Sequence, residues 1–239
     1  MNENINMKRC IRTFLGLVMI LGVAPRAALA LFPGEQPIGL FSKVILDVTH
    51  KVPDNDWQKA TRGQTLGSGD MVKTGLRSFA VIKFKDNSLV RVREQSEVTV
   101  AGTLQEKTFS KSVDVRNGGV GFNVTKQRTE EEFRFSSPTS VASIRGTGGV
   151  FIRGEFDTLT VIDGAVLIRN TVSSDTATVL AGYTAISGPD GSLHVRASTR
   201  EEQRSAEDAT RSGDQPRQLK LQLRNPQGEE KELILDYKE

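Results

Sequence analysis

The feature that most constrains the fold is an alternation of apolar and polar side chains in short runs across residues 43–187. Apolar residues at every second position give a strand one buried face, and the Gly, Asn, Asp and Ser residues between the runs are typical of turns. The runs are residues 44–48, 79–84, 89–93, 97–100, 112–115, 120–124, 133–135, 141–144, 150–153, 158–162, 165–169 and 176–180. This spacing predicts an all-β fold of many short strands, in an irregular β-solenoid-like or sandwich-like roll.

One local pairing is predicted from the turn chemistry. The runs at residues 79–84 and 89–93 flank Lys85, Asp86, Asn87 and Ser88. Asn and Asp tolerate the backbone conformation of a tight turn, so we expect the two runs to form a hairpin. No fixed repeat length recurs along the chain, so the alternation does not by itself establish a regular solenoid.

The composition changes after residue 196. Residues 199–218 mix charges of both signs with almost nothing apolar, which predicts a solvated charged helix or linker. Residues 219–223 and 232–237 alternate again on either side of an Asn-Pro-Gln-Gly turn, which predicts a C-terminal β-hairpin. Because two strands alone are marginal in water, we expect this hairpin to dock on the main sheet or to add to the edge of a partner.

The first thirty residues have the order of a secretory signal peptide. Basic residues precede an apolar run at residues 14–23, and the small residues Ala28 and Ala30 follow where a signal peptidase cleaves. We expect cleavage after Ala30 and no membrane span after it, since the run is shorter than the roughly 20 residues that cross a bilayer. An uncleaved N-terminal anchor is the alternative. Export predicts a periplasmic or envelope-associated protein.

Removing the signal peptide changes the charge. Residues 1–30 hold four of the 32 Lys and Arg residues and one of the 29 Asp and Glu residues, so equal numbers of each sign remain. The sole cysteine, Cys10, is also lost. A chain without net charge or thiols is not expected to bind nucleic acid, to use disulfides or to carry a catalytic cysteine.

The sequence contains no constellation typical of catalysis or of metal binding. The two histidines, His50 and His194, lie far apart in the sequence, and surface or packing roles are expected for both. Residues 118–124 nearly fit a calcium-binding nonapeptide, but the segment occurs once and carries Asn123 in place of the ligand Asp. We therefore expect no catalytic residue, no cofactor and no metal site.

A set of spaced residues resembles the FecR domain. The resemblance begins at Trp57 and ends at Gly182, and its most specific elements are Gly-Asp-x-Val-x-Thr-Gly at residues 69–75 and Arg-Gly-Thr at residues 145–147. The positions that carry it, which we interpret as structural turns, are Gly69, Asp70, Thr74, Gly75, Asp86, Asn87, Ser88, Arg145, Gly146, Thr147, Gly164 and Gly182.

The resemblance implies an extracytoplasmic all-β domain and kinship with the iron-dicitrate regulator, which spans the inner membrane and passes a transporter signal to a sigma factor. This sequence lacks that regulator's cytoplasmic helical segment, so direct control of a sigma factor is not expected. The predicted layout is a signal peptide at 1–30, an N-terminal strand and lead-in at 31–56, a FecR-like domain at 57–187, a charged linker or helix at 188–218 and a hairpin at 219–239.

These observations predict a stand-alone, non-enzymatic exported module that binds an envelope protein or a glycan. A membrane-anchored signalling subunit related to sigma-factor regulators is the first alternative. An envelope hydrolase is the second, because carboxylates distant in the sequence can meet in a fold. The sequence names neither the partner nor the oligomeric state.

Overall fold

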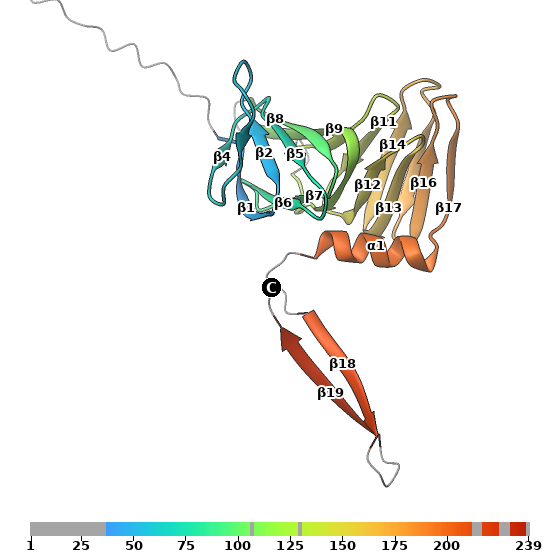
Figure 1. Cartoon of the computed structure of the whole chain (residues 1–239). Coiled ribbons are helices and arrows are strands. Elements are labelled where there is room, and N and C mark those ends of the chain that lie inside the picture. Colours follow the sequence, from blue (N-terminus) through green and yellow to red (C-terminus); the bar gives the residue numbers. More distant parts are fainter. Residues whose placement is uncertain (1–36, 106–107, 129–130, 212–216, 225–229, 238–239) are drawn as a thin grey trace, which may run out of the picture. The chain divides into compact units, whose positions relative to one another are not determined.

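The computed structural model describes residues 37–105, 108–128, 131–211, 217–224 and 230–237. The predicted signal peptide, including Ala28 and Ala30, lies outside these residues. Strands dominate the described chain, and the all-β prediction is confirmed (Figure 1). No helix among the described residues has the length and apolarity needed to cross a bilayer.

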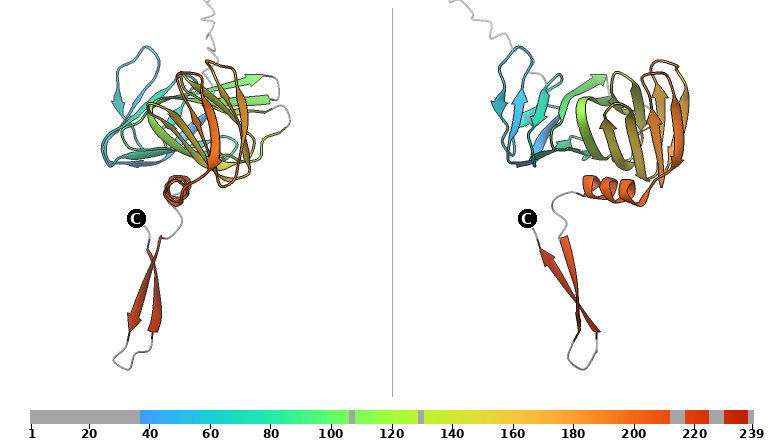
Figure 2. Two further views of the ribbon diagram at one scale, coloured as in Figure 1. Left: turned by 90° about the vertical axis from the view of Figure 1, so that its right-hand side faces the viewer. Right: turned by 45° about the vertical axis from the view of Figure 1, so that its right-hand side comes forward.

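Two layers of paired strands, which we call sheet A and sheet B, share the long strand β9 (Thr108–Asn123) (Figures 1 and 2). The order in sheet A is β4 (Thr65–Leu66), β1 (Gly39–Ile45), β6 (Phe79–Phe84), β7 (Leu89–Val92), β9, β12 (Gly148–Arg153), β13 (Asp157–Asp163), β16 (Tyr183–Ser187) and β17 (Leu193–Ala197). The order in sheet B is β3 (Gln58–Lys59), β2 (Val48–Lys51), β5 (Met71–Thr74), β8 (Glu97–Gln105), β9, β10 (Phe133–Ser136), β11 (Ser140–Ile144), β14 (Ala165–Asn170) and β15 (Thr176–Leu180). Only the β9–β10 pairing is parallel among the described strands.

Strand β9 corrects one prediction. Residues 112–115 and 120–124 were expected to form two strands, but residues 112–123 belong to one strand that pairs in sheet B up to Asn117 and in sheet A from Gly118. Gly118 has a φ of +74°, and a Cβ there would lie 2.2 Å from Ser96 Oγ. The glycine therefore lets a single strand bend from one layer into the other without breaking its hydrogen bonding.

The run at residues 44–48 is also corrected. It was expected to form one strand, but β1 ends at Ile45 and β2 begins at Val48. Leu46 between them has a φ of 59°. The amide of Asp47 donates to Ser78 Oγ at 3.0 Å, and its carbonyl accepts from the Gly75 amide at 2.8 Å. These bonds hold a corner that alternation alone does not reveal.

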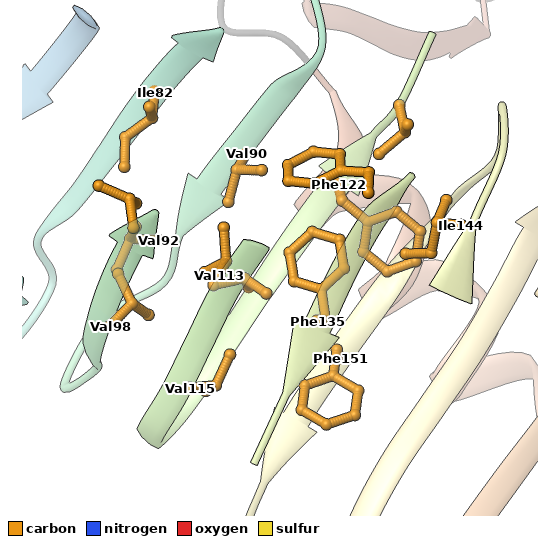
Figure 3. Packing of buried hydrophobic residues seen from close by; sticks show 14 of the residues in the cluster. Ile82, Val90, Val92, Val98, Val113, Val115, Phe122, Phe135, Ile144 and Phe151 are labelled. Atoms are coloured by element: carbon orange, nitrogen blue, oxygen red, sulfur yellow. The ribbon is translucent and has the colours of Figure 1, made fainter. Parts of the chain in front are cut away.

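The core lies between the sheets and is filled by the apolar residues at alternate positions. Figure 3 shows side chains of sheet A, such as Ile82 and Phe122, pointing toward side chains of sheet B, such as Val113 and Phe135. The Phe122 and Phe135 rings stack with their centroids 4.9 Å apart. Full burial of each such side chain contributes about 1.5–3 kcal/mol, so this interface is the main source of stability.

The predicted 85–88 hairpin turn is confirmed, with Lys83 opposite Leu89 and Asn87 at a φ of 67°. The predicted C-terminal hairpin is also present as β18 (Arg217–Arg224) and β19 (Glu230–Tyr237), which pair only with each other among the described strands.

The charged segment contains the helix α1 (Arg200–Thr210). The predicted charged helix is therefore present, but one of its faces is not solvated, because Ala206 and Ala209 are buried against Val150 of β12. Ile152 and Ile162 pack against the same cluster. Helix α1 thus lies on the outer face of sheet A, where alanine is small enough to let the helix approach the strands closely.

Candidate functional site

The FecR-like motif residues lie mainly at corners where the chain passes between the two sheets. Gly69 and Asp70 precede β5, Thr74 ends it and Gly75 follows it, and the Arg145–Thr147 corner joins β11 to β12. Gly164 and Gly182 stand between β13 and β14 and between β15 and β16. Among the motif glycines, Gly69, Gly146, Gly164 and Gly182 have positive φ. Arg145 and Gly164 are exposed, and the glycines of the set shape the backbone at these corners.

The first polar cluster of motif residues surrounds Asp70. His50 Nε2 donates to Asp70 Oδ2 at 2.8 Å, and Gln64 Nε2 donates to His50 Nδ1 at 3.0 Å. The same carboxylate oxygen accepts from the Gly67 amide at 2.8 Å. His50 and Asp70 are both buried, so this cluster fixes a corner and His50 is packed inside the fold.

The second polar cluster surrounds Asp86 in the β6–β7 turn. The Asp86 carboxylate accepts from Lys111 Nζ at 2.6 Å, from Ser88 Oγ at 2.7 Å and from Gln127 Nε2 at 2.9 Å. The Lys111 side chain is 0% exposed. Burial disfavours the carboxylate, but the hydrogen bonds from Lys111, Gln127 and Ser88 outweigh it and lower the pKa of Asp86. This cluster ties the hairpin of sheet A to β9.

The two motif threonines, Thr74 and Thr147, form separate hydrogen bonds and do not join either polar cluster. Thr74 Oγ1 donates to the Arg93 carbonyl and accepts from the Ser96 amide at 3.0 Å. Thr147 Oγ1 donates to the Ala165 carbonyl at 3.1 Å, beside Gly164. Among the described residues, no three His, Cys, Asp or Glu side chains are grouped so that they could hold a metal ion.

An open hollow on the outer face of sheet A is the candidate binding site. Its volume is about 510 Å³, within the range of ligand sites. We call it the arginine groove. The sheet side is lined by Arg77, Ser78, Phe79, Arg91, Arg93 and Glu94, and the α1 side by Ser205, Asp208 and Ala209.

The arginines of the groove differ in how they are engaged. The Arg91 guanidinium lies 3.9 Å from the centroid of the Phe79 ring and donates to the Asp208 carbonyl of α1 at 3.2 Å. The guanidinium groups of Arg77 and Arg93 form no hydrogen bond or ion pair with any described residue. Glu94 Oε2 accepts from the Arg77 backbone amide at 2.8 Å, so this carboxylate is directed at the main chain. Two cationic groups are therefore left to meet a ligand.

A second hollow, of about 300 Å³, lies on sheet B, and the cationic side chains that line it are paired within the chain. Its arginine, Arg134, forms an ion pair with Glu132 at 2.6 Å. The side chain of Lys111, which also lines it, is paired with Asp86. Charges already paired within the chain offer less to a ligand, so the arginine groove is the stronger candidate.

Helix α1 reaches the groove because two outward positions of β9 are glycines. A Cβ on Gly121 would lie 2.1 Å from the Ala209 carbonyl oxygen, and one on Gly119 would lie 3.1 Å from Ile152 Cγ1. The near-fit of this segment to a calcium motif thus has a packing explanation. A side chain at Gly121 would displace the helix that forms one wall of the groove.

The other end of α1 is fixed by Glu202. Thr199 and Glu202 form a capping box, and Arg196 donates to both carboxylate oxygens of Glu202, at 2.9 and 2.7 Å. The bond from Arg196 is the largest influence on Glu202 and lowers its pKa to about 2. The cap and the ion pair hold the helix against β17.

Acid should release this end of α1. Since the pKa of Glu202 is depressed in the folded protein, the stabilisation is present above pH 4.5 and is lost as the pH falls toward about 2. Loss of the cap should cost α1 about 1 kcal/mol. A carboxyl-carbon NMR titration should give Glu202 a pKa of about 2, with α1 amide signals moving in the same window. Arg196→Gln should move the titration toward higher pH, and a wild-type Glu202 that titrates near 4.5 would contradict the pairing.

The groove residues were missed by sequence reasoning. Arg77, Phe79, Arg91 and Arg93 carry no motif, and α1 follows them by more than a hundred residues. One signal was available: Arg91 and Arg93 alternate with buried Val90 and Val92, so both arginines must face outward.

Comparisons with known proteins give two solved structures that align with this chain and one matching protein family. Two crystal structures, each described as that of a "putative anti-sigma factor" from Parabacteroides distasonis ATCC 8503, align with a TM-score of 0.46 each at 12% and 11% identity. Each alignment covers 55% of this chain and 61% of that chain, less than two thirds of its length. No curated protein matches this sequence.

Residues 70–167 match the family model described as FecR protein. The chain therefore carries a FecR domain at residues 70–167, and the predicted FecR-like domain is confirmed over those residues.

Proposed function

We propose that this chain is an exported, non-enzymatic signalling module that binds a protein partner in the periplasm or cell envelope through the arginine groove. The FecR domain supports a regulatory role. The observation that carries the proposal is the pair of guanidinium groups, Arg77 and Arg93, that line the groove without a partner among the described residues. Arginine is favoured at protein interfaces because its planar donors recognise carboxylates in two-point contacts.

The strands of sheet A that form the groove are suited to binding a partner. Arg91 and Phe79 stand on neighbouring strands of a sheet that is packed on the core, so the groove is presented by rigid elements. Rigid presentation lowers the entropy lost on binding. The groove contains two acidic residues, Glu94 and Asp208, and Glu94 is bound to a backbone amide.

The exported form should begin at Leu31. Signal peptidase cleavage after Ala30 removes the basic segment and the apolar run, so intact-mass measurement of the protein recovered from cells should give the mass of residues 31–239. The full-length mass in a membrane fraction would instead support the anchored signalling subunit and overturn the exported form.

Binding is tested by recovering the protein from envelope extract after mild cross-linking and identifying what is attached. We expect one partner protein to be recovered, and the purified chain to release no products from cell-wall or polysaccharide substrates. Elution of the chain alone, together with hydrolysis of such a substrate, would replace the proposal with an envelope hydrolase.

A further inference from the structure

We infer that the ligand of the arginine groove is an acidic segment of the partner protein, held in an extended conformation with carboxylates that reach Arg77 and Arg93. This inference rests on the proposed binding function and adds the chemistry of the partner. It follows from the charges in the groove, from the spacing of its residues and from the cations that contact its aromatic ring.

The charges favour a ligand with carboxylates. Arg77 is exposed, Arg93 is half-buried, and neither guanidinium has a partner among the residues that the structure describes. The Glu94 carboxylate, which could have neutralised one of them, instead accepts from the Arg77 amide at 2.8 Å. Lys43 adds a further cation nearby, with its Nζ 5.4 Å from the centroid of Phe79. Three arginines against two carboxylates leave the lining cationic, and a cationic hollow attracts anionic groups.

The spacing favours an extended peptide. Arg91 and Arg93 are two residues apart on β7 and its continuation, which places them about 7 Å apart on the same face. Carboxylates at alternate positions of an extended segment have the same spacing. Arg91 is held in place by the ring of Phe79 and by the Asp208 carbonyl of α1, so a segment that places one carboxylate at Arg93 brings its next alternate side chain to this fixed cation.

The aromatic ring favours a peptide over a glycan. Sugars with carboxylates would also meet the arginines, but glycan sites commonly add an open aromatic face. Phe79 is the aromatic residue that lines the groove, and both Lys43 and Arg91 lie over its ring. With its ring contacted by two cations, Phe79 is poorly placed to stack on a sugar.

The inference is tested by an NMR titration of the protein purified from cells. The probe is a synthetic peptide in which Glu and Ser alternate, and the control peptide has Gln in place of Glu. We expect the Glu peptide to shift the signals of Arg77, Arg93 and the α1 residues that line the groove, and its affinity to fall as salt is raised. The Gln peptide should leave these signals unchanged.

Matched variants locate the site. The double variant Arg77→Gln, Arg93→Gln should bind the Glu peptide about tenfold more weakly or worse, as expected for the loss of charge-assisted hydrogen bonds. Arg169→Gln removes an exposed arginine of β14 on sheet B and should bind like the wild type. Folding of each variant is checked by its thermal midpoint.

Three results would overturn the inference. They are equal binding of the Glu and Gln peptides, unchanged affinity in the double variant, and preference for an oligogalacturonate, which would make the groove a glycan site. If either of the first two occurred while a partner protein was still recovered from the envelope, the proposed function would stand and only the acidic segment would be withdrawn, whereas a glycan site in the groove would overturn both.

Discussion

Asp86→Ala should lower the free energy of unfolding by about 3–5 kcal/mol, the usual cost of breaking a buried ion pair. The Lys111 side chain is 0% exposed, and its Nζ lies 2.6 Å from the Asp86 carboxylate. Removing that carboxylate takes the counter-charge from a buried ammonium group and a shared acceptor from Ser88 and Gln127. Chemical denaturation followed by fluorescence of the single tryptophan, Trp57, measures the change.

Two further variants test this explanation. Adding Lys111→Met to Asp86→Ala should recover part of the lost stability, because a buried apolar side chain needs no counter-charge. Asp175→Ala, at an exposed turn, should change stability by less than about 0.5 kcal/mol. A double variant no more stable than Asp86→Ala would contradict the role given to the ion pair. Since the pKa of Asp86 is lowered in the folded protein, the wild type should also lose this stabilisation as the pH falls below 3.8.

Gly121→Ala should detach the C-terminal half of α1 from sheet A. The added Cβ would lie 2.1 Å from the Ala209 carbonyl oxygen and 2.7 Å from the Ala209 Cβ, so the helix must move away. We expect a loss of about 1–3 kcal/mol, typical of overpacking, and faster hydrogen exchange in α1. Arg91 should lose its bond to the Asp208 carbonyl, which opens the groove.

The matched control for this change is Gly154→Ala. A Cβ on Gly154 would meet only the Phe156 carbonyl oxygen, at an ordinary contact distance of 3.5 Å. Exchange in α1 should therefore remain at the wild-type rate in this variant. Equal rates of hydrogen exchange in α1 of the Gly121 and Gly154 variants would mean that the packing of α1 on sheet A does not depend on Gly121.

Most strands were predictable because a period of two is a local property of the sequence. The alternation of Val90 and Val92 with Arg91 and Arg93 places β7 and its buried face without any tertiary knowledge. The resemblance at residues 69–75 and 145–147 likewise marked positions that the structure puts at corners. The backbone conformation of these corners is determined by residues close together in the sequence, so short sequence motifs can predict it.

The pairing of distant strands and the groove were not predictable in this way. Strand β12 pairs with β9, and β13 pairs with β16, through contacts that no local pattern encodes. The bend of β9 at Gly118 was read as a break between two strands, because a glycine between apolar runs is more often a turn. Similarly, α1 has few apolar residues, and its two buried alanines match the outward Gly121 only once the fold is known.

The most direct test of the binding account is site-specific photo-cross-linking in living cells. A photoreactive amino acid in place of Ser205 stands in the α1 wall of the groove, and one in place of Arg169 stands on sheet B as the control. We predict a discrete protein adduct from position 205 that disappears when Arg77→Glu and Arg93→Glu are added, and none from position 169. An adduct that persists in the charge-reversed protein, or that forms equally from position 169, would contradict the arginine groove as the binding site.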